Sequence, residues 1–177
     1  MPTKRITKRK STNKKQTAKL NPALKRLAVL AGDWQMELSN SAFLPNQGDT
    51  VKGFASIAWA EDGAFLLMRQ GDRPPSPPAA IWLMNRDEST EEYRVFYFDA
   101  RGVSRIYNMS FDGSSWKMWR EAPGFSQRFE GKVSRDHKTI RAHWDKSVDG
   151  RQWEHDFDMT YTRETPRGFR RLNKAKR

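Results

Sequence analysis

Hydrophobic and polar residues alternate with a period of two along most of this chain. The alternating stretches are rich in aromatic and β-branched residues and are separated by turn sequences such as Asp62-Gly63 and Asp112-Gly113. Such alternation indicates half-buried strands, and Asp-Gly is a strong signal for a tight hairpin. The pattern predicts ten strands, over residues 33–43, 50–60, 64–71, 79–87, 92–99, 103–111, 115–121, 125–134, 138–146 and 151–163.

The links between these strands are short, and this decides how the strands pair. Parallel neighbours need a crossover of a dozen or more residues, so short links join antiparallel neighbours. A long meander is expected to close on itself, because closure removes exposed strand edges. One short helix precedes it, since Asn21-Pro22 provides an N-cap and a first-turn proline, and Gly32 ends the helical pattern. The sequence predicts an all-β fold, an antiparallel up-and-down barrel with one N-terminal helix.

The alternation also predicts which side chains face the barrel interior. Trp34 faces inward on the first strand. The last strand has a polar face that includes Asp156 and an apolar face that includes His155 and Arg163, and the polar face must lie in water. The inward residues expected to line a cavity are His155, Tyr161, Tyr107, Met109, Trp144 and Phe157.

This lining is aromatic and contains few polar groups, which is typical of a small-molecule site. The sequence therefore predicts that the barrel interior binds a small hydrophobic or amphipathic molecule, with His155 and Tyr161 orienting its polar end. The alternative is an interior that large rings fill completely, since the chain has seven tryptophans.

The excess of positive charge lies at the two ends of the chain. The whole sequence has 33 Lys and Arg against 21 Asp and Glu, a formal net charge of +12. Residues 1–20 contain many basic residues and no acidic one, residues 164–177 are also basic, and residues 21–163 are nearly neutral. Segments so poor in large apolar residues cannot repay the entropy of ordering. We therefore expect two disordered basic tails, 1–20 and 164–177, around one barrel domain, 21–163.

The basic tails suggest a second class of function. Blocks of like charge attract phosphates, either in nucleic acid or on an anionic membrane surface. In that case the barrel is a scaffold. The alternatives are tails that only add solubility, or an N-terminal nuclear address. The sequence has no apolar stretch of transmembrane length, and we expect a cytoplasmic protein without a transmembrane segment.

The sequence offers little catalytic machinery. It has no cysteine, which excludes disulfides, thiol nucleophiles and Cys-based metal sites. Its three histidines are not expected to meet, because His137 lies in a predicted turn, His143 faces outward and only His155 faces inward. We therefore expect no catalytic residue and no metal site. The alternative is an isomerase or cyclase with His155 as general base and Tyr161 as donor.

One motif links the chain to a known family. Gly32-Asp33-Trp34, directly after the helix, resembles the Gly-x-Trp signature of the calycin superfamily, which includes lipocalins and fatty-acid-binding proteins. The resemblance implies a lipocalin-like barrel in which a basic residue late in the final strand, here Arg163, packs over Trp34 and closes one end. A guanidinium stacked on an indole and partly shielded from water stabilises such a contact by about 1–2 kcal/mol.

The later part of the chain is similar to two branches of that superfamily. Asp99-Ala100-Arg101-Gly102 and the segment 153–157 look like small bacterial calycin-like proteins with no established activity. The architecture is also similar to the ten-stranded nitrobindin-like branch, whose members hold haem through a histidine in the last strand. That resemblance implies His155 as a haem ligand. The alternative is that this single histidine is an ordinary hydrogen-bonded residue of the interior.

Overall fold

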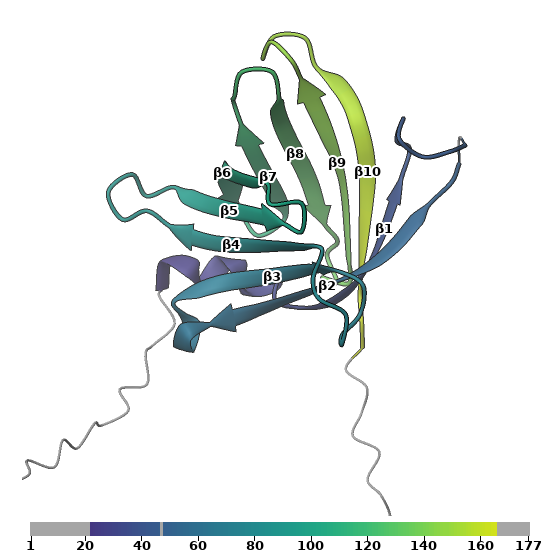
Figure 1. Ribbon diagram of the computed structural model, residues 1–177. Coiled ribbons are helices and arrows are strands. Elements are labelled where there is room, and N and C mark those ends of the chain that lie inside the picture. The colour runs from purple at the N-terminus through teal and green to yellow at the C-terminus, as the bar shows by residue number, and fades with distance from the viewer. Residues whose placement is uncertain (1–21, 47, 166–177) are drawn as a thin grey trace, which may run out of the picture.

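The computed structural model describes residues 22–46 and 48–165 and forms a closed antiparallel barrel of ten strands (Figure 1). The all-β prediction and all ten predicted strands are confirmed, with ends that differ by a few residues. The strands are β1 (Gly32–Ser39), β2 (Val51–Ala60), β3 (Phe65–Gly71), β4 (Ala80–Arg86), β5 (Tyr93–Asp99), β6 (Ser104–Phe111), β7 (Ser115–Arg120), β8 (Ser126–Val133), β9 (Thr139–Ser147) and β10 (Glu154–Arg163).

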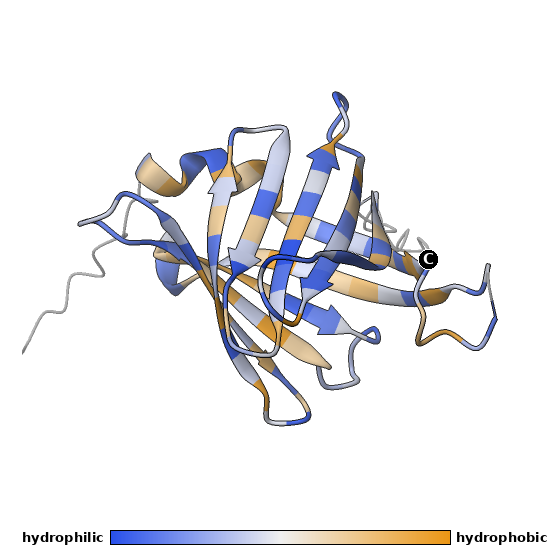
Figure 2. Ribbon diagram, turned by 90° about the horizontal axis from the view of Figure 1, so that it is seen from above, coloured by the Kyte–Doolittle hydropathy of each residue, from blue (hydrophilic) through white to orange (hydrophobic). Residues whose placement is uncertain are grey.

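Each strand pairs with its neighbours in sequence, and β1 also pairs with β10 to close the barrel. At this seam Trp34 lies opposite Arg163, and Met36 lies opposite Tyr161. Hydrophilic and hydrophobic residues alternate along the strands in Figure 2. The alternation places the apolar residues on the inner face, because successive side chains of a strand point to opposite faces.

The predicted helix forms at one end of the barrel as the 3-10 helix η1 (Pro22–Val29), purple in Figure 1. Leu24 and Leu27 are fully buried, and so is Leu30 just beyond the helix. The Tyr93 hydroxyl donates a hydrogen bond to the Ala23 carbonyl at 3.0 Å, which joins the helix to the start of β5. The helix therefore covers one end of the barrel with leucine side chains. A second 3-10 turn, η2 (Glu61–Gly63), links β2 to β3 at the predicted Asp62-Gly63 turn.

Arg163 and Trp34 meet at this covered end. The Arg163 guanidinium carbon lies 4.0 Å from the centre of the Trp34 ring. The same guanidinium donates hydrogen bonds to the carbonyls of His137 at 2.8 Å, Ala31 at 2.6 Å and Val29 at 2.5 Å. A Cβ at Gly32 would overlap the guanidinium, and Gly32 has a φ of +142°. The Gly-x-Trp motif thus provides both the stacked ring and the space for Arg163.

The two basic tails fall almost wholly outside the part of the chain that the structure describes. Their proposed disorder and their contacts with nucleic acid or an anionic surface therefore stay predictions, as do the domain boundaries at 21 and 163. Within residues 22–46 and 48–165, no helix is long and apolar enough to cross a membrane.

Candidate functional site

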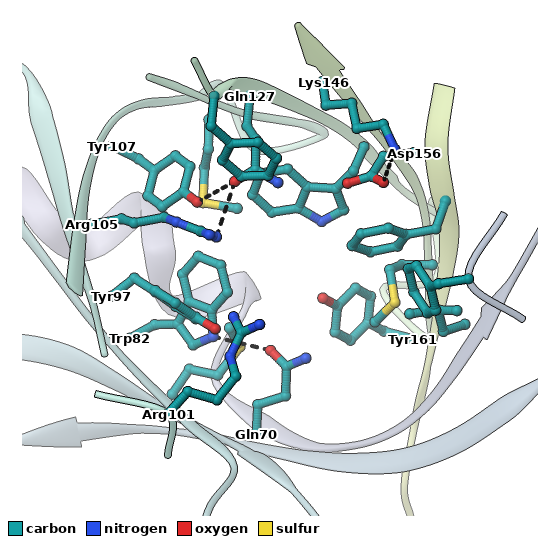
Figure 3. Close-up of a pocket in the computed structure, with 18 residues that line it drawn as sticks. Gln70, Trp82, Tyr97, Arg101, Arg105, Tyr107, Gln127, Lys146, Asp156 and Tyr161 are labelled. Atoms are coloured by element: carbon teal, nitrogen blue, oxygen red, sulfur yellow. Dashed lines mark hydrogen bonds and ion pairs between the residues drawn. The ribbon is translucent and has the colours of Figure 1, made fainter. Parts of the chain in front are cut away.

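The barrel contains a cavity of about 340 Å³ at the end opposite η1 (Figure 3). The helix contacts the start of β5, whereas the cavity is lined by residues near the end of that strand, such as Tyr97. The lining residues come from most strands and from three loops: Leu38, Phe43, Met68, Gln70, Trp82, Tyr97, Arg101, Arg105, Tyr107, Met118, Phe125, Gln127, Trp144, Lys146, Asp156, Phe157, Met159 and Tyr161.

Aromatic rings form one wall of this cavity. The ring centres of Trp82, Tyr107 and Trp144 lie 5.7 to 6.1 Å from one another. Beneath them Phe129 lies 5.1 Å from Trp144 and 4.9 Å from Trp116, and both Phe129 and Trp116 are buried. Large rings therefore fill part of the interior, as the filled-barrel alternative expected, while the opposite part remains hollow. The wall offers a flat apolar surface to a ligand.

Two glutamines hold polar members of the wall in place. The Tyr107 hydroxyl donates a 2.7 Å hydrogen bond to Gln127 Oε1, and Arg105 Nη1 donates to the same oxygen at 3.3 Å. Trp82 Nε1 donates a 3.0 Å hydrogen bond to Gln70 Oε1. Because these bonds fix the ring orientations, the polar edge of the cavity is preorganised.

The Tyr161 hydroxyl faces the open centre of the cavity in Figure 3. The side chain is buried, with its ring centre 6.4 Å from that of Trp116. Burial raises the pKa of Tyr161, so the phenol keeps its proton at neutral pH and can donate a hydrogen bond. Across the described residues, no side chain or carbonyl makes a hydrogen bond with this hydroxyl. It is therefore a polar group that a bound molecule can satisfy.

Two ion pairs lie at the rim. Lys146 Nζ lies 3.2 Å from Asp156 Oδ1, and Arg101 Nη2 lies 2.6 Å from Asp99 Oδ2. The hydrogen bond from Arg101 holds the pKa of Asp99 well below its usual range. Tyr97 donates a 2.9 Å hydrogen bond to the same carboxylate, and burial together with that bond raises the pKa of Tyr97 to about 12. Asp99 and Asp156 are thus carboxylates with cationic partners.

Four of the six predicted lining residues lie in the cavity wall. They are Tyr107, Trp144, Phe157 and Tyr161. Met109 faces inward as predicted but is buried within the core, away from the cavity. The sixth residue, His155, lies outside the barrel.

The prediction that His155 faces the interior is wrong, because β10 contains a β-bulge. His155 pairs with Asp145 and Phe157 pairs with Trp144, so Asp156 is an extra residue between them. A bulge reverses the faces of the residues on one side of it relative to simple alternation. His155 therefore points outward with 44% of its side chain exposed, and Asp156 lines the cavity instead.

The residues of the cavity do not fit haem. Its wall contains no histidine among the described residues, and His155 lies on the outer surface with Nε2 3.5 Å from Asp158 Oδ1. The isomerase or cyclase alternative loses its general base for the same reason. His137 lies in a turn and His143 faces outward with 43% of its side chain exposed, as predicted. In residues 22–46 and 48–165, no group of three His, Asp or Glu side chains is arranged to hold a metal ion.

Sequence reasoning missed the charged groups of the lining. Arg105 is two residues from Tyr107, and Lys146 is two residues from Trp144, so strict alternation would have placed both inward. They were overlooked because long charged side chains are usually exposed. Arg101 comes from the turn after β5, where alternation gives no information.

The comparison with solved structures supports this fold. No protein-family model matches the chain, and no curated protein matches it significantly. Among solved structures, the chain resembles the crystal structure of Rv2717c from M. tuberculosis, with a TM-score of 0.51 and 12% sequence identity. The match covers 83% of this chain and 100% of that chain. At this level of identity, the likeness shows a shared barrel fold and carries no function.

Proposed function

We propose that the barrel binds a small amphipathic molecule in the cavity opposite η1. The observation that carries this proposal is the pairing of an aromatic wall with an unsatisfied hydroxyl. Trp82 and Trp144 offer apolar surface, and Tyr161 offers a hydrogen-bond donor toward the same space. A volume of about 340 Å³ suits a small organic molecule. Such a ligand would place its apolar body on the rings and its polar end toward the rim.

We also propose that the protein is a calycin, similar to small bacterial calycin-like proteins with no established activity. Support comes from Gly32-Asp33-Trp34 at the start of β1 and from the stacking of Arg163 on Trp34. In this proposal the covered end provides stability and the hollow end provides binding. Localisation in the cytoplasm remains a prediction.

Blocking the cavity tests the proposed binding. Leu38 is half-buried and lines the cavity near the end of β1, so Leu38→Trp would place an indole in the space that a ligand occupies. We expect the neutral dye N-phenyl-1-naphthylamine to become fluorescent with the unaltered protein. The variant is expected to weaken this binding by about tenfold or more, because the apolar surface is already covered. A fluorescence titration measures both dissociation constants.

Ile106→Trp is the matched control for that experiment. Ile106 lies on the outer face of β6 and is 59% exposed, so this variant adds the same indole outside the barrel. Its affinity for the dye should equal that of the unaltered protein. Equal weakening by both variants, or no binding by the unaltered protein, would contradict interior binding.

A further inference from the structure

Arg105 is a half-buried cation without an anionic partner. Its side chain lines the cavity, and within the described part of the chain no carboxylate lies within ion-pair distance of its guanidinium. Its hydrogen bond goes to the neutral Gln127 amide at 3.3 Å. The two other cations of the lining differ, since Arg101 pairs with Asp99 and Lys146 pairs with Asp156.

Aromatic rings hold the Arg105 guanidinium in position. Its central carbon lies 4.7 Å from the centre of the Phe125 ring and 5.7 Å from that of Tyr97. Such contacts stabilise a guanidinium and remove part of its hydration. They also restrict its motion, so less side-chain entropy is lost when a ligand binds. The group is thus preorganised at the cavity wall next to Tyr107 (Figure 3).

Among the charged side chains that line the cavity, one positive charge is uncompensated. Asp99 neutralises Arg101 and Asp156 neutralises Lys146, which leaves Arg105 as the excess. A partly desolvated charge gains most from a partner of opposite charge that is desolvated with it. One negative charge on the ligand would balance Arg105, whereas a second negative charge would find no further unpaired cation among the lining residues.

We propose that the cavity selects amphipathic monoanions that carry a carboxylate, and that Arg105 is the residue that determines this selectivity. The inference rests on the proposed binding function and specifies its ligand class. The planar guanidinium of Arg105 matches a planar carboxylate in shape. Within the described residues, Arg105 uses Nη1 for its hydrogen bond to Gln127. The apolar body then lies on Trp82 and Trp144, and the Tyr161 hydroxyl can donate a second hydrogen bond.

A pair of matched ligands tests this selectivity. The planar carboxylate 2-naphthoate and its neutral analogue 2-naphthamide have the same ring system and differ in charge. Each is titrated against the full-length protein loaded with N-phenyl-1-naphthylamine, and loss of dye fluorescence gives its affinity. We expect 2-naphthoate to bind about tenfold more tightly or better, since hydrogen bonds to charged groups exceed those to neutral ones.

Variants of Arg105 assign the preference to this residue. Arg105→Gln should weaken 2-naphthoate binding by about tenfold and leave 2-naphthamide within about twofold. Arg105→Lys keeps the charge without the fork, so it should retain part of the preference. Arg69→Gln is the control. Arg69 is exposed on the outer face of β3, so this substitution removes one positive charge away from the cavity. It should change neither affinity.

The possible outcomes separate this inference from the proposed function. Equal affinities for the two ligands in the unaltered protein would overturn the selectivity while dye binding still supports interior binding. An unchanged preference in Arg105→Gln would overturn the role of Arg105. If Arg105→Gln does not fold, Arg105→Lys and the two ligands decide the question. Failure of the proposed function itself would appear as dye binding that Leu38→Trp does not weaken.

Discussion

Replacing Arg163 with methionine is expected to lower the free energy of unfolding by about 3 kcal/mol. The substitution keeps most of the aliphatic stem but removes the cation over Trp34 and the donors to three carbonyls. Those carbonyls belong to Val29, Ala31 and His137, so this one side chain joins β10 to the end of η1, to the residue before β1 and to the turn between β8 and β9. Urea unfolding followed by tryptophan fluorescence measures the loss.

The conservative variant Arg163→Lys separates charge from geometry. Lysine keeps the positive charge near Trp34, but an ammonium cannot reproduce the planar fork that reaches several carbonyls. We expect about half of the loss seen with methionine, roughly 1.5 kcal/mol. If Arg163→Met unfolds at the same urea concentration as the unaltered protein, the closure at Trp34 does not stabilise the barrel.

Replacing Leu27 with alanine is expected to destabilise the protein by about 3 kcal/mol. Leu27 is a fully buried residue of η1. Its truncation therefore removes apolar contacts and leaves a cavity at the covered end of the barrel. A short 3-10 helix has little stability of its own, and burial of its leucines is what fixes it on the barrel. Thermal and urea unfolding measure the effect.

Lys25→Ala is the control on the same helix, because Lys25 is exposed. We expect a change within about 0.5 kcal/mol, as for most surface substitutions. A loss below about 1 kcal/mol in Leu27→Ala would show that the helix is dispensable to the barrel.

The strand pattern could be predicted from the sequence because one physical constraint governs all ten strands. A barrel has a wet face and a dry face, so each strand alternates, as Ile140, Ala142 and Trp144 show on β9. Short links and Asp-Gly turns then leave antiparallel neighbours as the available pairing. Pro22 and Gly32 predicted the position of the helix, which is a 3-10 helix in the structure.

The bulge in β10 could not be predicted, because no residue in the segment marks it. The segment His155-Asp156-Phe157 contains no glycine or proline, which are the residues that often mark a bulge, and simple alternation continues through it. The extra residue is visible only in the register with β9. This single irregularity moved the favoured polar ligand contact, His155, to the outer surface and brought Asp156 to Lys146.

The charged part of the candidate site depends on side-chain contacts both across a turn and between strands that are distant in sequence. Arg105 shares the inward face of β6 with Tyr107, but its lack of a carboxylate partner depends on β5 and β8. Asp99 neutralises Arg101 across a turn, which sequence spacing alone does not reveal. Side-chain alternation therefore predicted the apolar wall, whereas the charge balance required the three-dimensional structure.

Methyl NMR of protein labelled with ¹³C at the methionine methyl groups tests interior binding most directly. Met68, Met118 and Met159 line the cavity, whereas Met84 and Met109 are buried outside it. Addition of 2-naphthoate is predicted to shift the first three methyl signals through the ring current of the bound ligand and to leave the other two unchanged. Saturation of the ligand without a shift of the three cavity methyl signals would contradict binding inside the barrel.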